Sequence, residues 1–198
     1  TLAFHSKRGK LSPGTSKTMI EGLGRGGRVR KDGRIVRVPT AYKTQNIKFE
    51  DQESLAVTIP WGDVSTVFYT TKIPNIEVYV GISSKNLRGL KVSRILSPLF
   101  RLPGVRYALK NRVTKKTKGP SCEQRKQTRT FVFGKAVEEN GLTETLRLET
   151  PDGYSLTADA ALQATLRILA KVPRLGAQTP SQAFGEDFIL GLQGVTKM

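Results

Sequence analysis

Two turn dipeptides, each set between segments rich in β-branched residues, constrain the fold of this chain more than any other feature. Asp32-Gly33 separates residues 28–31 from 34–38, and Asn140-Gly141 separates 130–138 from 143–149. Both dipeptides favour the tight turn that joins two antiparallel strands. Strands joined as hairpins, rather than alternating with helices, argue against a doubly wound parallel sheet. We therefore expect an α+β fold with a mixed, largely antiparallel sheet, helices packed on one face and a basic amphipathic helical insert.

Periodicity and capping residues predict the other elements. The segment 12–15 offers Ser12 or Thr15 as the cap of a helix that ends at the glycines 24, 26 and 27. Asp63 is expected to cap a helix that runs to about Thr71. Two or three short helices are expected in 87–113, and a loop in 114–125. The clearest predicted helix is 155–172, with Leu156, Leu162, Leu166 and Leu169 on one stripe and Pro173 just beyond it. Further strands are expected at 1–6, 44–49, 54–59 and 76–82.

The length and the scarcity of certain side chains exclude several classes of protein. The chain has 198 residues, which is enough for one domain with a real core. Cys122 is its only cysteine, which excludes an internal disulfide, and His5 is its only histidine, which leaves too few ligands for a zinc site. No apolar stretch reaches the roughly 18 residues that span a bilayer. We expect an intracellular protein without a bound metal, either cytoplasmic or peripheral to a membrane.

The net charge of +17 is concentrated in two blocks. Residues 85–135 hold 15 basic residues and one acid, Glu123, whereas residues 7–43 hold 11 basic residues and two acids. The segments 44–84 and 136–198 each carry a net charge of −3. The two basic blocks therefore require separate explanations.

The first basic block contains a glycine pattern with two readings. Gly22-Leu23-Gly24-Arg25-Gly26-Gly27 satisfies the spacing of a dinucleotide-binding loop, but that loop must follow a strand and precede a helix. Here a predicted helix precedes the glycines and a predicted hairpin follows them, so a helix-terminating loop is the favoured reading. The Arg-rich segment 26–37 has no aromatic residue between Phe4 and Tyr42 on which a base could stack, so we do not expect nucleic-acid binding.

Three other features near the start of the chain are candidates for chemistry. The segment 12–17 combines hydroxyls, Lys17 and the free amides of a helix start, which suits either an anion cradle or simple helix capping. Trp61 is the only tryptophan, and we interpret it as a core anchor rather than a ligand platform. His5 has no acid or nucleophile close to it in sequence and is not predicted to be catalytic.

The second basic block has two physical interpretations. Leucines and an isoleucine alternate with basic residues through 87–112, as in a helix that lies at a membrane interface and meets anionic lipid. The alternative is a pair of surface helices that are packed on the domain by their leucines. The residues expected to face an anionic surface are Arg88, Lys91, Arg94, Arg101, Arg106, Lys110 and Arg112.

Several long motifs occur in an order that carries a resemblance to a known family. They are LSPGTSKTMIEGLGRGG, GRVRKDGRIVRVP, AVTIPWGDVSTVFYTTKIPNIEVYVG, LETPDGYSLTADAAL and TPSQAFGEDFIL. Together they resemble the C-terminal part of the saccharopine dehydrogenase-like NAD(P)-binding oxidoreductases, a group that includes trans-acting enoyl reductases. The resemblance runs from about residue 2 to 195 and is weakest at about 105–128.

The resemblance implies a role beside a cofactor domain. In that family an N-terminal Rossmann domain binds NAD(P), and the α+β domain that follows closes the substrate cleft and supports dimerisation. Residues 1–198 then form a single C-terminal substrate and oligomerisation domain, with a basic insert at 85–128, that binds no cofactor and is inactive without the missing Rossmann domain. By resemblance, the segments that face the cleft contain Ser12, Gly14, Thr15, Lys17, Trp61, Gly62 and Asp63.

The expected partners follow from these two readings. The resemblance implies a homo-oligomer and the Rossmann domain of the parent enzyme. The alternative function is a peripheral module that binds an anionic membrane surface through residues 85–135.

Overall fold

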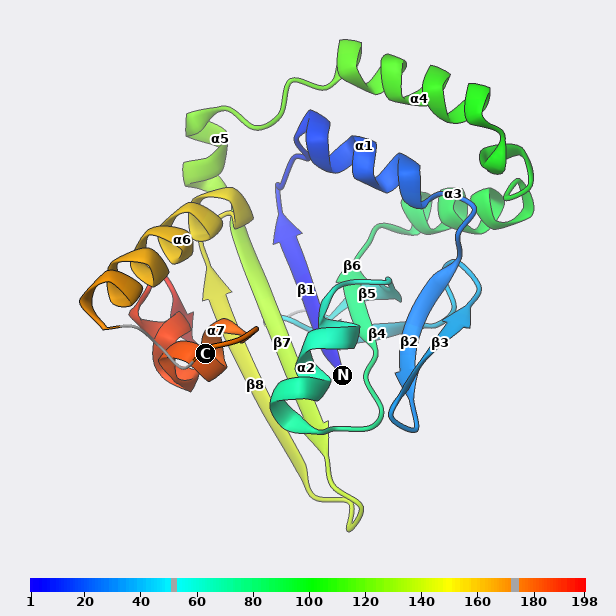
Figure 1. The fold of residues 1–198 in the computed structure, drawn as a ribbon. Coiled ribbons are helices and arrows are strands. Elements are labelled where there is room, and N and C mark those ends of the chain that lie inside the picture. Colours follow the sequence, from blue (N-terminus) through cyan, green and yellow to red (C-terminus); the bar gives the residue numbers. More distant parts are fainter. Residues whose placement is uncertain (51–52, 172–174) are drawn as a thin grey trace.

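A curled sheet of seven strands forms the centre of the computed structural model, which describes residues 1–50, 53–171 and 175–198 and every side chain among them except that of Arg101 (Figure 1). The strand order is β4-β5-β6-β1-β7-β8-β9, and β1 and β6 are parallel while the other neighbours are antiparallel. The fold is therefore α+β with a mixed, mostly antiparallel sheet, as predicted. The strands are β1 (Leu2–Lys7), β4 (Thr44–Lys48), β5 (Glu53–Thr58), β6 (Val78–Gly81), β7 (Arg129–Val137), β8 (Thr143–Thr150) and β9 (Thr196–Lys197).

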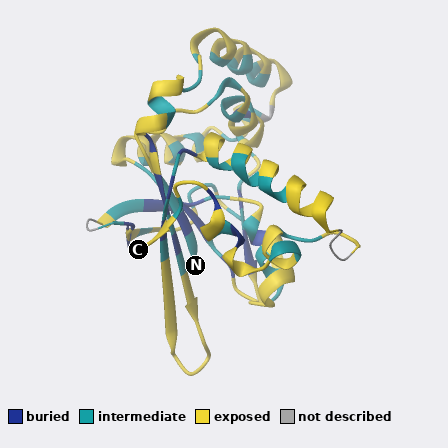
Figure 2. Ribbon diagram, turned by 90° about the vertical axis from the view of Figure 1, so that its left-hand side faces the viewer, coloured by how far each residue is buried: buried dark blue, intermediate teal, exposed yellow. Residues whose placement is uncertain are grey.

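Both predicted hairpins are present. Strands β2 (Gly27–Lys31) and β3 (Arg34–Val38) form a separate two-stranded sheet, and its turn residues Asp32 and Gly33 have φ angles of 49° and 75°. These left-handed values explain why the turn uses Asp-Gly. The β7–β8 hairpin turns at Gly141 and extends well beyond the rest of the molecule, where it is exposed (Figure 2).

Alternating residues of the central strands supply two hydrophobic clusters, one on each face of the sheet. Ala3, Phe131 and Phe133 face the side across which β4 and β5 curl, where Ile47, Phe49, Ala56 and Tyr79 complete the main core. Leu2 and Val78 face the opposite side and pack against Val64 of helix α2. The buried residues accordingly gather where the strands cross (Figure 2).

Helices lie around this sheet and beyond one end of it. They are α1 (Pro13–Gly22), α2 (Asp63–Thr71), α3 (Ser84–Ile95), α4 (Pro103–Lys116), α5 (Cys122–Gln127), α6 (Gly153–Ala170) and α7 (Pro180–Phe184), with the 3-10 helices η1 (Leu99–Arg101) and η2 (Glu186–Gly191). The basic insert is the segment from α3 to α5, between β6 and β7. Its helix α4 packs on α1 rather than on the sheet (Figure 1).

Several local expectations were wrong. The loop predicted at 114–125 is shorter, because α4 continues to Lys116 and α5 begins at Cys122 under the capping residue Ser121. Asp63 does not cap α2, because Gly62 occupies the cap position and Asp63 is the first helical residue. Trp61 is no core anchor, because 52% of its surface is exposed.

Helix α6 is present where it was predicted, but its leucine stripe does not face a core. Leu162, Leu166 and Leu169 are 56%, 51% and 79% exposed. The predicted end of this helix at Val172 and Pro173 lies outside the described residues. A leucine stripe of this kind is normally covered, so α6 presents a bare apolar face.

Candidate functional site

Helices α3 and α4 form the first part of the basic insert, and α4 packs on α1. Leu87, Leu90 and Leu109 are half-buried, whereas Ile95, Leu99 and Leu102 are exposed. Neither α3 nor α4 contains a fully buried residue. Some of the leucines therefore pack on the domain, and those near η1, where the chain reverses direction, do not.

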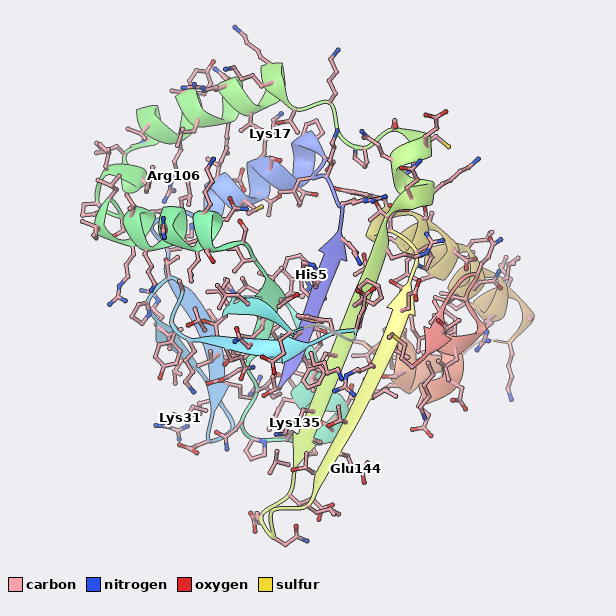
Figure 3. The ribbon with its side chains drawn as sticks, turned by 180° about the vertical axis from the view of Figure 1, so that it is seen from behind. His5, Lys17, Lys31, Arg106, Lys135 and Glu144 are labelled. Carbon is pink, nitrogen blue, oxygen red and sulfur yellow. The ribbon has the colours of Figure 1, made fainter. Side chains whose placement is uncertain are left out.

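Of the residues expected to face an anionic surface, Arg101 has a side chain outside the described part of the structure, and the others fall into two groups. Arg88, Lys91, Arg94 and Arg112 are exposed to solvent. Lys110 and Arg106 are half-buried and turn towards α1, where the Lys110 ammonium pairs with the Glu21 carboxylate. The hydrogen bond from Lys110 lowers the pKa of Glu21. Figure 3 shows nitrogen-tipped side chains that extend outwards from α3 and α4, and it labels Arg106 on α4 and Lys17 on α1.

Exposed apolar side chains surround η1, in the middle of this positive charge. Ile95 is 78% exposed and Leu102 53% exposed. Apolar groups beside Lys and Arg are the composition that partitions into an anionic lipid interface. We call this surface the apolar apex; it consists of Val92, Ile95, Leu96, Leu99, Leu102 and Tyr107.

The Ser12 motif forms a hydroxyl cluster at the start of α1. Of the two predicted candidates, Ser12 is the cap, and its side chain accepts a hydrogen bond of 3.1 Å from the Thr15 amide. Thr15 Oγ1 lies 3.0 Å from Ser12 Oγ and 3.2 Å from the Tyr154 hydroxyl. Gly14 and Lys17 lie on the same two turns of α1, Gly14 exposed and Lys17 half-buried.

Tyr154 is a functional candidate that the sequence did not reveal. It lies on the first turn of α6, and its hydroxyl accepts a hydrogen bond of 2.7 Å from the Ser12 backbone amide. Burial acts to raise the pKa of Tyr154, but the hydrogen bonds from Ser12 and Thr15 outweigh it and the pKa is lowered. The available sequence signal was Asp152, a residue type that caps the start of a helix, but nothing in the sequence shows that Tyr154 meets Ser12.

The second predicted motif lies against a different part of β1. The Trp61 ring packs on Phe4 of β1 with 5.3 Å between ring centroids, and Gly62 and Asp63 start α2. The Ser12 motif instead follows the carboxyl end of β1. The structure thus attaches both motifs to one strand, at separate positions, rather than gathering them into one cluster.

The glycines 22–27 end α1 and lead into β2, so their order is the reverse of a dinucleotide-binding loop. Gly24 and Gly26 have φ angles of 76° and 74°. A Cβ at residue 26 would lie 2.8 Å from the Val38 carbonyl oxygen, so the chain requires glycine there. The loop is therefore helix-terminating, as predicted.

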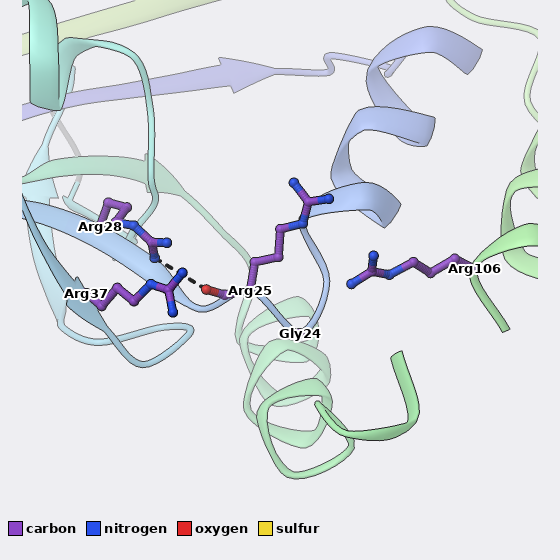
Figure 4. A pocket seen from close by; sticks show the side chains of 5 residues that line it. All are labelled: Gly24, Arg25, Arg28, Arg37 and Arg106. Carbon is purple, nitrogen blue, oxygen red and sulfur yellow. Dashed lines mark hydrogen bonds between the residues drawn. The ribbon is translucent and has the colours of Figure 1, made fainter. Parts of the chain in front are cut away.

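Beside this loop lies a cavity of about 450 Å³ that is lined by Gly24, Arg25, Arg28, Arg37 and Arg106 (Figure 4). Its lining contains four guanidinium groups and no carboxylate. Of these four arginines, only Arg106 was among the residues expected to meet an anion.

Within residues 1–50, 53–171 and 175–198, no three His, Cys, Asp or Glu side chains are grouped in a way that could hold a metal ion. In the same ranges, none of the helices combines the length and the apolar character that crossing a bilayer requires.

Comparison with known proteins found no protein-family model and no curated protein that matches the chain.

Proposed function

We propose that this chain is the substrate-side and dimerisation domain of a saccharopine dehydrogenase-like NAD(P)-dependent oxidoreductase, and that it is inactive without a cofactor domain. The observation that carries the proposal is the bond between Tyr154 and Ser12. The two residues belong to different motifs of the resemblance and are 142 residues apart in sequence. Their contact makes the two motifs parts of one structural unit.

The chemistry of the hydroxyl cluster suits a substrate site. The Tyr154 oxygen accepts from the Ser12 amide, so its own proton is available to Thr15 or to a polar group of a substrate. Since 38% of Tyr154 is exposed, a substrate can reach the hydroxyl. A tyrosine with a lowered pKa is a suitable proton donor. In this proposal NAD(P) is bound by the parent protein's Rossmann domain and supplies the hydride.

A titration tests whether the cofactor is bound by this domain or by the proposed cofactor domain. We expect calorimetry to detect no micromolar binding of NADPH by residues 1–198, and NADPH binding by the product of a reading frame extended upstream of Thr1. In that longer protein, Tyr154→Phe lowers turnover without changing the dissociation constant for NADPH, and the exposed Tyr107→Phe serves as the matched control. Micromolar NADPH binding by residues 1–198 alone contradicts the proposal.

The apolar apex supports a second candidate function, the binding of an anionic membrane surface. Six exposed apolar side chains lie within the block that carries 15 basic residues. Burial of these side chains among lipid acyl chains, with Arg and Lys at the headgroups, would use both features.

Co-sedimentation with vesicles tests this function. We expect binding to vesicles that contain phosphatidylserine, weaker binding to pure phosphatidylcholine, and loss of binding with Ile95→Glu/Leu102→Glu. Leu142→Glu, which changes an equally exposed leucine on the β7–β8 hairpin, is the matched control. Equal binding to neutral and anionic vesicles at low salt excludes this function.

A further inference from the structure

The arginine cavity brings together charges from elements far apart in the sequence. Arg25 lies in the loop after α1, Arg28 and Arg37 lie on the paired strands β2 and β3, and Arg106 lies on α4. Figure 4 shows Arg28 and Arg37 lying beside one another and Arg106 extending towards the loop from the facing helix. A hollow lined by four guanidinium groups has a strongly positive potential.

Two of the four guanidinium groups are held in place by backbone carbonyls. Arg106 donates from Nε to the Phe100 carbonyl at 2.6 Å and from its terminal nitrogen to the Leu23 carbonyl at 3.3 Å. Arg28 donates to the Gly27 and Arg25 carbonyls at 2.8 and 3.3 Å. Each guanidinium has five N–H donors, so donors remain for a ligand after these bonds are made.

The arrangement is unfavourable for the protein alone. Arg28 and Arg37 are directly opposite one another in the β2–β3 ladder, where like charges destabilise a hairpin. The Glu21 carboxylate pairs with Lys110 and also feels the charges of Arg25 and Arg106, but among the described residues no carboxylate lines the cavity itself. An anion in the cavity would remove the repulsion between the paired arginines.

We propose that this cavity binds a phosphate-bearing anion, with Arg28, Arg37 and Arg106 as its ligands. Planar guanidinium groups match phosphate oxygens in pairs, and the volume of about 450 Å³ accommodates a sugar or polyol that carries more than one phosphate. The ligand is either a soluble phosphate ester or the headgroup of a phosphorylated lipid. The inference rests on neither proposed function, because the cavity contains none of the hydroxyl cluster or the apolar apex.

Calorimetry with inositol 1,4,5-trisphosphate and with inorganic pyrophosphate, at constant ionic strength, tests the proposal without a membrane or a nicotinamide cofactor. We expect saturable binding at one site, weakened about tenfold or more by Arg37→Gln and further by Arg28→Gln/Arg37→Gln. Arg34→Gln removes an exposed arginine from the same strand outside the cavity and is the matched control, expected to change affinity less than twofold. Absence of saturable binding, or equal losses from Arg34→Gln and Arg37→Gln, overturns the proposal.

Thermal unfolding without ligand gives an independent readout. Arg37→Gln relieves the repulsion with Arg28, so the melting temperature is expected to stay unchanged or to rise, which distinguishes lost binding from lost folding. If Arg37→Gln weakens binding and also lowers the melting temperature by several degrees, the loss of binding reflects loss of folding, and the assignment of Arg37 as a ligand is overturned.

Vesicles identify the source of the phosphate. Vesicles that contain phosphatidylinositol 4,5-bisphosphate are compared with vesicles that contain enough phosphatidylserine to have the same surface charge. A preference for the former that is lost in Arg28→Gln/Arg37→Gln assigns the site to a lipid headgroup, and equal binding assigns it to a soluble ester. Binding through the apolar apex alone persists in this variant, so the failure of one proposal is distinguishable from the failure of the other.

Discussion

The His5 side chain lies so close to residue 81 of the neighbouring strand that only glycine fits there. Its ring packs against Phe49, and its Nδ1 is buried without a hydrogen-bond partner. A Cβ built on Gly81 would lie 2.2 Å from that nitrogen and 2.8 Å from the His5 Cβ. The only histidine of the chain thus packs closely against Phe49 and Gly81.

We expect Gly81→Ala to lower the free energy of unfolding by about 1–3 kcal/mol, because strand β6 or β1 must shift to admit the methyl group. Gly89→Ala is the matched control. Nothing lies within 4 Å of a Cβ at residue 89 in helix α3, so this change should raise stability by about 0.5–1 kcal/mol. Urea denaturation measures both, and equal effects of the two changes would contradict the packing account.

A partly buried carboxylate makes stability depend on pH. Burial acts to raise the pKa of Glu77, but hydrogen bonds from Lys43 and Tyr79 outweigh it and lower the pKa. The stabilisation by Glu77 is therefore present above its unfolded pKa and is lost as pH falls through the lower folded pKa.

We expect Glu77→Gln to cost about 1 kcal/mol at neutral pH, and the difference from the native chain to shrink below about pH 4. Glu144→Gln, on the exposed hairpin, should leave the pH profile of urea unfolding as it is in the native chain. A constant difference between Glu77→Gln and the native chain from neutral to acid pH would show that the carboxylate does not titrate as described.

At the scale of the element, helix α6 depends on its first residues. Asp152 is 4% exposed, and its Oδ1 accepts from the Tyr154 and Ser155 amides at 3.0 and 3.4 Å. This cap also fixes the turn from which Tyr154 reaches Ser12. The Asp152 side chain therefore supports both the stability of α6 and the position of Tyr154 in the hydroxyl cluster.

Asp152→Ala is expected to lower the free energy of unfolding by about 1–2 kcal/mol, because two amides at the start of α6 lose their acceptor. Asp152→Asn retains a capping oxygen and should cost less. Thermal unfolding monitored by circular dichroism compares the two variants, and the capping account fails if Asn is as costly as Ala.

Elements that are specified locally were predictable from the sequence. The Asp32-Gly33 and Asn140-Gly141 hairpins and the cap at Ser12 depend on residues within a few positions of each other, and all are present in the structure. Contacts between distant segments were not predictable. The hydroxyl cluster needs Tyr154 to meet α1, and the arginine cavity needs Arg106 to fold over the loop at Arg25. Periodicity likewise predicted the α6 helix but not that its leucines face outwards.

At the scale of the whole molecule, charge determines where two copies can meet. The chain carries +17 overall, but residues 136–198 carry a net charge of −3 and contain the bare leucine face of α6. The repulsion between two copies is weaker across this region than across the basic blocks, because its net charge is smaller. We propose that α6 is the contact between copies in a symmetric dimer, because a two-fold axis lets one apolar stripe cover its own equivalent.

Leu166→Glu is expected to convert that dimer to a monomer, because the carboxylate would be buried without a partner. Sedimentation equilibrium measures the change, with Leu142→Glu as the matched control on the distant hairpin. A native chain that sediments as a monomer, or a Leu166→Glu variant that still dimerises, contradicts the assignment.

The position of β1 affects how the molecule can fold during synthesis. Among the strands of this sheet β1 is synthesised first, yet it lies at the centre of the sheet, between β6 and β7. Its partners Val78 and Phe133 are synthesised more than 70 and 120 positions later along the chain. Until then the apolar residues of β1 lack their partners in the sheet. Pairings this far apart in sequence close slowly, and folding is expected to complete only after β7 has emerged.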